Sequence, residues 1–171
     1  MSGSDPTVDV EVYVHAAGTS VWDDQARVVR RVEELAERGV VRAASVTMWP
    51  RRVCTEGGLE GTTFHSDALA AIERLSGWAD RAGVGLPFER HHVVSEFAGV
   101  DHEVIDTPAI CAAAADDGSV VGVYPHRHGS RTCTVGDLLD RVSREGADGA
   151  TCQPDVSRSL ASPSATSTDG A

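Results

Sequence analysis

Residues 8–15 alternate strictly between two kinds of side chain, and this pattern limits what the chain can fold into. Every second residue from Val8 to Val14 is valine, and the residues between them are polar or aromatic. A period of two is typical of a strand that buries one face. Apolar residues then recur at helical spacing from Val21 to Ala36, which predicts an amphipathic helix. A strand followed by such a helix indicates an α/β or α+β fold.

Capping residues and glycines set the limits of the predicted helices. Ser20 is expected to cap the first helix and Gly39 to end it. Ser66 and Gly83 are expected to do the same for a second helix. Thr134 is expected to cap a third, which runs for about ten residues.

Further strands are predicted between and after the first two helices. They cover residues 40–49, 88–97, 108–115 and 119–124, and the second of these reads as an edge strand. The last two flank Asp116-Asp117-Gly118, a sequence typical of a tight β-hairpin turn. The predicted order is β-α-β-α-β-β-β-α, with the helices packed on a mixed sheet.

The composition divides the chain into three parts. Residues 8–145 are predicted to form a single globular domain between a flexible leader (1–7) and a disordered tail (146–171) rich in Ser, Thr, Ala, Gly, Asp and Pro. The start of the chain lacks the basic and apolar regions of a secretory signal. No stretch approaches the roughly 20 apolar residues of a membrane helix. A cytoplasmic protein without a membrane partner is expected.

The charged residues have an unusual composition. All 15 basic residues are arginine, and they stand against 26 Asp and Glu for a net charge of −11. Abundant carboxylates keep a surface hydrated, and molar salt reduces the Debye length to about 3 Å, which screens their mutual repulsion. We therefore expect a cytoplasmic protein of an extreme halophile.

Arginines are concentrated in one segment. Between Ala26 and Cys54 lie seven arginines and three acids, so that segment carries +4 and the rest of the chain −15. Such asymmetry favours an anionic partner. The alternative for the helical arginines is ordinary pairing with glutamates four residues away. The candidates for contact with DNA or another anion are Arg27, Arg31, Arg42, Arg51 and Arg52, the last two following a proline with no acid beside them.

A second candidate site contains His126, His128 and Cys133. Two histidines one residue apart on a strand share a face, and Cys133 could approach them after a short turn. These ligands suit zinc, and His91 or His92 could supply a fourth. The alternative is a turn with exposed histidines, and no cofactor other than this possible zinc is predicted.

Motifs that carry enzymatic chemistry are absent from the sequence. The glycine-rich stretch at residues 57–61 fits neither a phosphate-binding loop nor a dinucleotide-binding turn, and no G-x-S-x-G occurs. Cys54, Cys111 and Cys133 could each form a thiolate, but nothing in the sequence places a base beside them. A non-enzymatic protein is expected.

Four short phrases occur in order along most of the chain. They are Val46-Thr-Met-Trp-Pro-Arg-Arg-Val-Cys54, Trp78-Ala-Asp-Arg81, Thr107-Pro-Ala-Ile-Cys111 and Thr132-Cys-Thr-Val135. Together they resemble a family of small acidic haloarchaeal proteins that are labelled helix-turn-helix domain proteins, over roughly residues 8–145. The resemblance implies DNA binding and a regulatory role, and it carries no catalytic residues.

The predicted order of elements is also similar to the thioredoxin fold. In that fold a cis-proline precedes a hairpin strand, and Pro108 would be that residue. The stretch Ala16–Val21 after the first strand contains no cysteine, so the resemblance implies a shell without redox activity.

The leading hypothesis is a regulatory or interaction protein that binds DNA through residues 27–52. One alternative is a protein-binding module with a redox-inactive thioredoxin-like fold, whose arginines meet an acidic partner protein. The other is a metal or thiol protein that uses His126, His128 and Cys133.

Overall fold

The computed structural model describes residues 8–16, 22–55, 63–96 and 99–151. Its largest sheet has four strands in the order β2-β1-β6-β7. These strands are β1 (Val8–His15), β2 (Ala43–Trp49), β6 (Ile110–Asp116) and β7 (Ser119–Tyr124). β1 pairs parallel with β2 and antiparallel with β6, and β6 pairs antiparallel with β7. The predicted mixed sheet is therefore confirmed.

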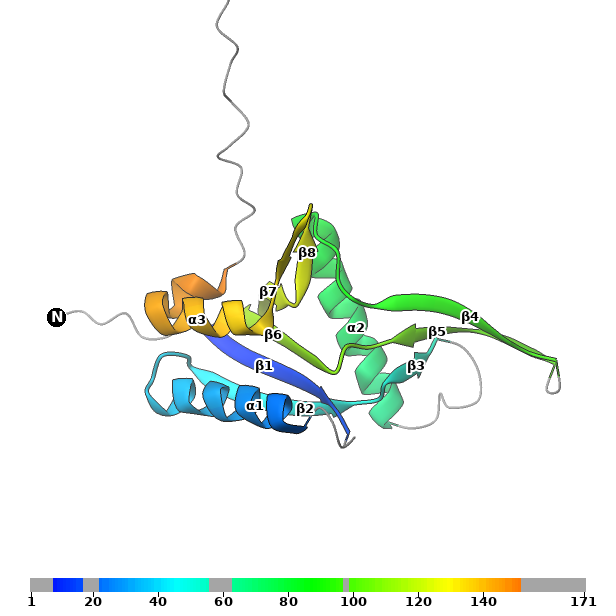
Figure 1. Cartoon of the computed structure of the whole chain (residues 1–171), viewed down its shortest axis with the longest axis horizontal. Helices are drawn as coiled ribbons and strands as arrows, with labels where there is room; N and C mark the ends of the chain where they lie inside the picture. The colour runs from blue at the N-terminus through cyan, green and yellow to red at the C-terminus, as the bar shows by residue number, and fades with distance from the viewer. Residues whose placement is uncertain (1–7, 17–21, 56–62, 97–98, 152–171) are drawn as a thin grey trace, which may run out of the picture.

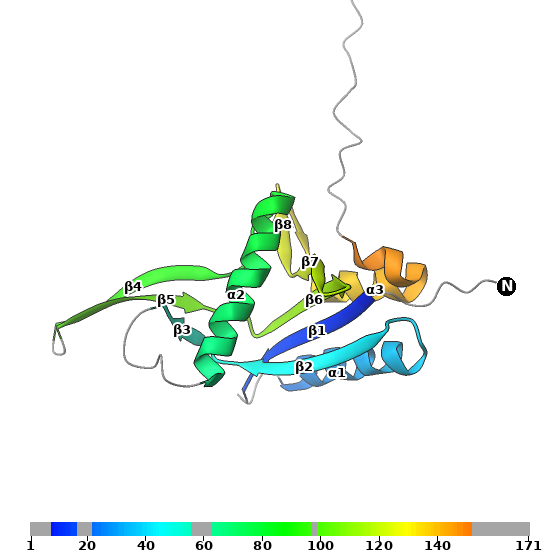
Figure 2. The ribbon, with the colours of Figure 1, turned by 180° about the vertical axis from the view of Figure 1, so that it is seen from behind.

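Helices cover both faces of this sheet. α1 (Trp22–Glu37) and α3 (Val135–Glu145) lie on one face, and α2 (Thr63–Ala82) lies on the other (Figures 1 and 2). The valines of β1 pack against α1 and α3, where Leu35 and Leu138 are buried. The opposite face packs Trp49 and neighbouring side chains against α2.

β1 is covered on both faces, although its alternation predicts burial of only one; on the second face Tyr13 is buried, and Asp9, Glu11 and His15 are half-buried. Tyr13 lies on the second face and is 6% exposed. Its hydroxyl donates to a Glu11 carboxylate oxygen at 2.8 Å and accepts from Arg74 of α2 at 2.8 Å. Burial is the largest of the effects that raise the pKa of Tyr13 to about 12, with the bond to Glu11 next. Polar residues on this face are thus accommodated by bonds to one another, so they do not indicate a solvent-facing strand.

Two smaller sheets were not predicted. One has the order β3-β5-β4 and contains β3 (Arg52–Cys54), β4 (Glu89–Ser95) and β5 (Val100–Asp106). β4 and β5 project from the body of the molecule as a hairpin arm (Figure 1). The other pairs β8 (His126–His128) with β9 (Arg131–Cys133). The sequence missed β3, β8 and β9 because three residues are too few to show a period, and β5 because acids interrupt it.

The ends of the first two helices match the predictions in part. Gly39 (φ 68°) and Gly83 (φ 67°) follow α1 and α2 in the left-handed region, as expected for C-terminal glycines. Ser66 is not a cap, because α2 already begins three residues earlier at Thr63. Ser20 lies outside the described residues.

The predicted cap of α3 is present. The Asp137 N–H donates to Thr134 Oγ1 at 3.2 Å, and the Thr134 N–H donates to the Asp137 carboxylate at 2.7 Å. This reciprocal pair is a capping box. The bonds from Thr134 hold the pKa of Asp137 below its ordinary value.

The tight hairpin is present and the proposed cis-proline is elsewhere. Asp117 (φ 46°) and Gly118 (φ 81°) both have positive φ, as a two-residue turn between β6 and β7 requires. In the described chain, the cis peptide bond precedes Pro125 and not Pro108. The segment before β6 is extended instead, with the Thr107 N–H donating to the Arg51 carbonyl at 3.0 Å.

The folded part continues past the predicted start of the tail. Residues 146–150 form a turn of 3-10 helix, and Ala150 is fully buried in the core beside α3. The glycine, alanine and aspartate residues of this turn are typical of a disordered segment, which is why disorder was predicted. The small residues instead allow the 3-10 turn to approach α3 closely, since a Cβ added at Gly149 would lie 2.5 Å from the Arg141 carbonyl oxygen. The predicted leader (1–7) and residues 152–171 lie outside the described residues.

Gly122 is the point where the 3-10 turn touches the sheet, and we expect Gly122→Ala to destabilise the fold. The added Cβ would lie 2.6 Å from the buried Ala150 carbonyl oxygen and 3.0 Å from the Tyr124 ring. Such overpacking costs about 1–3 kcal/mol of unfolding free energy. Thermal and denaturant unfolding measure the loss.

Gly77→Ala is the matched control. Gly77 lies inside α2, and its added Cβ would meet only the flexible end of Arg81 at 3.6 Å. Alanine has the better helix propensity, so this variant is expected to gain up to about 1 kcal/mol. Equal stability of the Gly122 variant and the parent protein would contradict the packing of the 3-10 turn on β7.

Candidate functional site

An open pocket lies where β1, β2 and β5 end. It has a volume of about 640 Å³, and we call it the basic pocket; its lining residues are His15, Arg51, Arg52, Asp106 and Thr107. His15 is the last residue of β1, and the two arginines follow β2. Ligands of open α/β sheets commonly bind at the carboxyl ends of the strands. The basic pocket therefore occupies a favourable place for a ligand.

Thr107 joins the segments that form the basic pocket. Its hydroxyl donates to the Pro50 carbonyl at 2.7 Å. The Nε2 atom of His15 lies 2.9 Å from Thr107 Oγ1 and 3.0 Å from the Thr107 carbonyl oxygen. Because a carbonyl can only accept, Nε2 carries the proton in neutral His15. Nδ1 is then the acceptor nitrogen of the ring.

The two arginines of the basic pocket differ in their partners. Arg52 Nε donates to an Asp106 carboxylate oxygen at 3.0 Å, and its side chain is 68% exposed. Arg51 is also exposed, and it forms no ion pair with any residue in the described ranges. Arg51 therefore presents a guanidinium that no described carboxylate neutralises. A guanidinium binds phosphate or carboxylate groups through two parallel hydrogen bonds.

His15 is expected to remain neutral at pH 7. Partial burial lowers its pKa most, the bond to the Thr107 backbone raises it, and the charge of Arg51 lowers it again. An unfolded chain titrates histidine near pH 6.5. The stability that comes from neutral His15 is thus complete above that pH and declines as the pH falls through it.

We expect Arg51→Ala to raise the pKa of His15, because the variant removes a nearby positive charge. A pH titration of the His15 ring resonances by NMR measures the change. Arg90→Ala is the control, since Arg90 pairs with Glu103 on the hairpin arm. An unchanged His15 pKa in the Arg51 variant would show that the guanidinium does not face the imidazole.

The other predicted arginines do not join the basic pocket. Arg42 precedes β2 and Arg51 follows it, so the two arginines lie at opposite ends of this strand. A strand of seven residues spans roughly 23 Å. Arg42 binds Asp9 at 2.7 Å and Asp117 at 2.9 Å. These two acids neutralise the guanidinium and raise its pKa, so Arg42 is a structural residue that joins β1, β2 and the hairpin turn.

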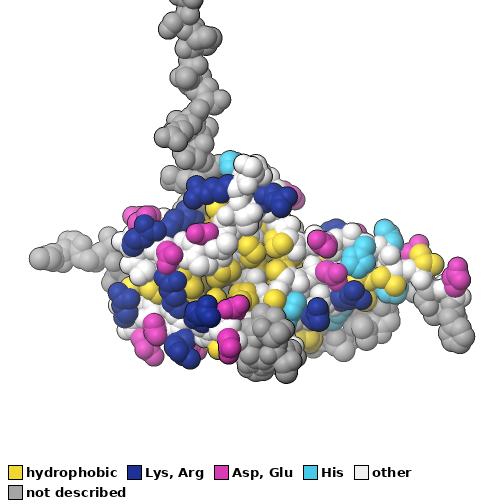
Figure 3. All heavy atoms as spheres, viewed as in Figure 1, with side chains coloured by type: hydrophobic (Ala, Val, Ile, Leu, Met, Phe, Trp, Pro, Cys, Tyr) yellow, Lys and Arg dark blue, Asp and Glu magenta, His cyan; other side chains and the backbone are white. Residues whose placement is uncertain are grey.

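The helical arginines are also paired. Arg27 lies 3.2 Å from Asp24, and Arg31 pairs with Asp140 of α3. Basic and acidic side chains alternate over the face formed by α1 and α3 (Figure 3). The segment 27–52 is therefore not one basic surface, because acids distant in sequence pair with Arg31, Arg42 and Arg52.

The predicted zinc ligands are not gathered into a site. His126 is 2% exposed, and its Nδ1 lies 2.6 Å from the Val123 carbonyl oxygen. His128 is exposed, while Cys133 faces His126 across the β8–β9 pair. Among the described residues, no three His, Cys, Asp or Glu side chains lie where they could hold a metal ion together. His91 and His92 lie on β4 of the hairpin arm and face Asp106 and Asp101.

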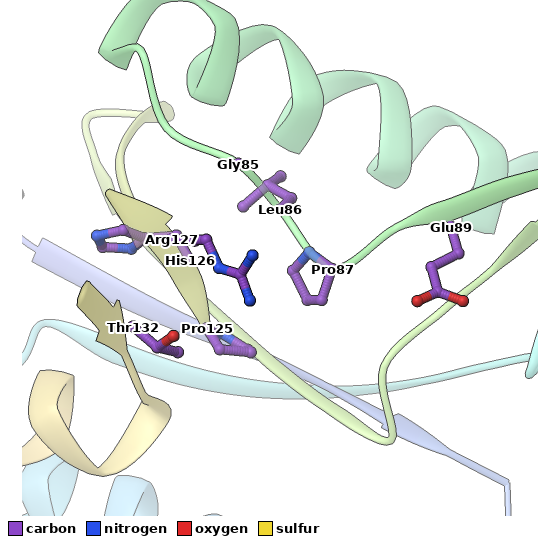
Figure 4. Close-up of a pocket in the computed structure, with 8 residues that line it drawn as sticks. All are labelled: Gly85, Leu86, Pro87, Glu89, Pro125, His126, Arg127 and Thr132. Atoms are coloured by element: carbon purple, nitrogen blue, oxygen red, sulfur yellow. The ribbon is translucent and has the colours of Figure 1, made fainter. Parts of the chain in front are cut away.

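A second pocket, of about 400 Å³, lies beside His126. Leu86 and Pro87 of the α2–β4 connection face Pro125 and Arg127 across it (Figure 4). Two backbone hydrogen bonds of 2.8 Å between Gly85 and Arg127 fix its width. Sequence reasoning missed this pocket because its two walls are about 40 positions apart and carry no motif.

The described cysteines are not paired in disulfides, and one of them lies in the core. Cys54, Cys111 and Cys133 are free, and Cys111 is fully buried. Burial raises the pKa of the Cys111 thiol well above neutral pH. Cys111 is thus a small apolar residue of the core.

Within the described chain, no two α-helices are joined by a short turn. α1 and α2 are separated by β2 and β3 and lie on opposite faces of the sheet (Figure 1). None of the described helices is long and apolar enough to cross a membrane.

The sequence of the chain was also compared with known proteins. Neither a curated protein nor a solved structure matches it. The sequence pattern of a family described as "Helix-turn-helix domain" matches residues 2–147. This match includes all four phrases noted in the sequence and nearly the whole described fold. The chain therefore belongs to this helix-turn-helix domain family.

Proposed function

We propose that this chain is a non-enzymatic regulatory protein that binds DNA and contacts phosphate groups through the basic pocket. Membership of a helix-turn-helix domain family supports DNA binding. The observation that carries the site is Arg51, an exposed guanidinium without a described carboxylate partner, beside Arg52 and His15. Arginine is a principal donor to DNA phosphates, and such contacts provide much of the affinity.

Arg52 can join Arg51 in binding an anion. Its ion pair with Asp106 is largely exposed, and exposed pairs contribute no more than about 1 kcal/mol. Exchange of the carboxylate for a phosphate therefore costs little. Arg42 differs because it binds two acids at once, and its release would leave both without their partner.

We propose further that the protein works in a cytoplasm of molar salt. The absence of lysine and the charge of −11 support this setting. Counterion release adds little to DNA affinity when the bulk salt is already molar. Affinity must then come from direct hydrogen bonds, and bidentate arginine is well suited to form them.

Fluorescence anisotropy with labelled genomic DNA fragments tests the proposal. The titration is run from low to molar KCl, so that binding confined to low salt is recognised as non-specific attraction. Saturable binding that persists in molar KCl supports the proposal. No binding at any salt concentration would overturn it.

Protein binding is the second candidate function. The order β2-β1-β6-β7, with α1 and α3 on one face and α2 on the other, is the arrangement that a thioredoxin-like core requires. The segment after β1 contains no cysteine, so such a core would bind and not reduce its partner. Arg51 would then meet a carboxylate of an acidic partner protein. Co-purification at native salt with DNA removed separates this function from DNA binding.

A further inference from the structure

We propose that the outer edge of β2 is a dimer interface, through which two copies of this chain pair antiparallel. β2 is the outermost strand of the four-stranded sheet, next to β1 alone. None of its seven residues is charged. Val46 is 43% exposed and Met48 is 58% exposed. An uncharged strand edge with exposed apolar side chains is the kind of surface that adds another strand.

The other outer strands of the described sheets do not combine an uncharged edge with exposed apolar side chains. β4 is also an outer strand, but four of its seven residues, Glu89–His92, are charged or titratable. β7 is also an outer strand without charge, but its residues 122–124 are buried and none of its large apolar side chains is exposed. β3 has only three residues. Charges are a usual means by which proteins block edge pairing, and β2 has none.

Charge favours a second copy at this edge over other contacts between copies. Each chain carries −11, and burial of an unpaired carboxylate against a second copy is costly because the carboxylate loses its water. β2 brings no charge to the contact. Arg42 at one end of the strand is already neutralised by Asp9 and Asp117, so it does not repel the Arg51 end of the other copy.

The backbone of β2 presents its free hydrogen-bonding groups in a register that suits a two-fold axis. The His15 N–H donates to the carbonyl oxygen of Ala109, the residue before β6, at 3.1 Å. The backbone N–H and C=O groups of the odd-numbered β1 residues therefore point toward β6, and those of the even-numbered residues point toward β2. In the parallel pairing of β1 with β2, the backbone groups of the odd-numbered β2 residues form the hydrogen bonds to β1. The N–H and C=O groups of Ala44, Val46 and Met48 point outward.

A two-fold axis at Val46 pairs all of these outward groups. Val46 faces the partner's Val46 in a hydrogen-bonded pair, and Met48 faces the partner's Ala44. A large side chain thus lies opposite a small one. The three side chains share the face of the sheet that packs on α1.

This dimer would give the basic pockets a spacing suited to DNA, an extension that rests on the proposed function. Arg51 lies two residues beyond Trp49, the last residue of β2, so Arg51 and the partner's Arg51 are separated by at most ten extended residues, roughly 33 Å. One turn of B-DNA is about 34–36 Å. The two-fold axis is perpendicular to the sheet that the two copies form together. Both basic pockets therefore have the same orientation relative to this axis.

Disulfide trapping tests the register in the full chain without DNA. Val46→Cys places two thiols opposite each other, with Cα atoms about 5.5 Å apart, within the range for a disulfide. We expect a covalent dimer under a mild oxidant such as diamide. Met48→Cys is the control, because Met48 is more exposed but lies roughly 14 Å from its symmetry mate. Equal trapping of both variants, or of neither, would overturn the register.

Sedimentation in molar KCl tests the dimer itself. The parent protein is expected at twice the chain mass, and Val46→Lys at the chain mass, because it places two ammonium groups opposite each other. Val94→Lys on the hairpin arm changes an even more exposed valine and should remain dimeric. A monomeric parent protein would overturn the proposal. Sedimentation is measured without DNA, so it tests the dimer independently of the proposed function. If the protein is a dimer here but does not bind DNA in the anisotropy titration, only the proposed function is refuted.

Discussion

Trp49→Ala is expected to lower the free energy of unfolding by about 3–5 kcal/mol. Trp49 is 1% exposed at the end of β2. Its ring stacks on Tyr13 at 4.9 Å between centroids and meets Phe88 edge-on at 5.9 Å. Its indole N–H donates to the Pro108 carbonyl at 3.2 Å. The variant leaves a cavity in the core that contains Trp49. It also leaves the Pro108 carbonyl, which lies next to Thr107 of the basic pocket, without the indole N–H that donates to it.

Equilibrium unfolding in denaturant measures this loss. Phe64→Ala is the control, because Phe64 is 48% exposed on α2 and its truncation should change stability by less than about 1 kcal/mol. Similar losses in the two variants would contradict the placement of Trp49 in the core that joins α2, the main sheet and the hairpin arm.

Arg51→Ala combined with Arg52→Ala is expected to weaken DNA binding roughly tenfold or more. Each hydrogen bond to a charged group contributes about 1.5–3 kcal/mol, and 1.4 kcal/mol corresponds to a factor of ten in affinity. Loss of two phosphate contacts should also reduce the salt dependence of binding by about two counterions. Anisotropy at several KCl concentrations measures both quantities.

Arg27→Ala combined with Arg30→Ala is the matched control. It removes the same charge from the chain, but from α1, where Arg27 is paired with Asp24. Long-range electrostatics changes equally in the two double variants. Any difference between them therefore reports direct contact at the basic pocket.

Local signals in the sequence predicted most of the main fold. The alternating valines of residues 8–14 and the turn at Asp117-Gly118 act over a few residues, and the structure confirms both elements. Thr134 and Asp137 are also near neighbours, so the cap of α3 was visible. Ser66 failed as a cap because a serine that can start a helix can equally lie within one.

Contacts between distant residues could not be predicted in the same way. Arg42 looked like a candidate for an anion, but its partners lie 33 positions before it and 75 after it. The basic pocket shows the same limit. Arg51 and Arg52 were identified in the sequence because no acid lies beside them. His15 and Thr107 were not identified, because these two residues lie 92 positions apart in the sequence. A histidine that ends a buried strand was the available signal for His15.

The most direct test of DNA binding at the basic pocket is one anisotropy titration in molar KCl with three proteins. These are the parent chain, the Arg51/Arg52 double alanine variant and the Arg27/Arg30 double alanine variant. We expect saturable binding by the parent and the α1 variant, and an affinity that is lower by roughly tenfold or more in the pocket variant. Equal affinity of all three proteins would contradict this expectation.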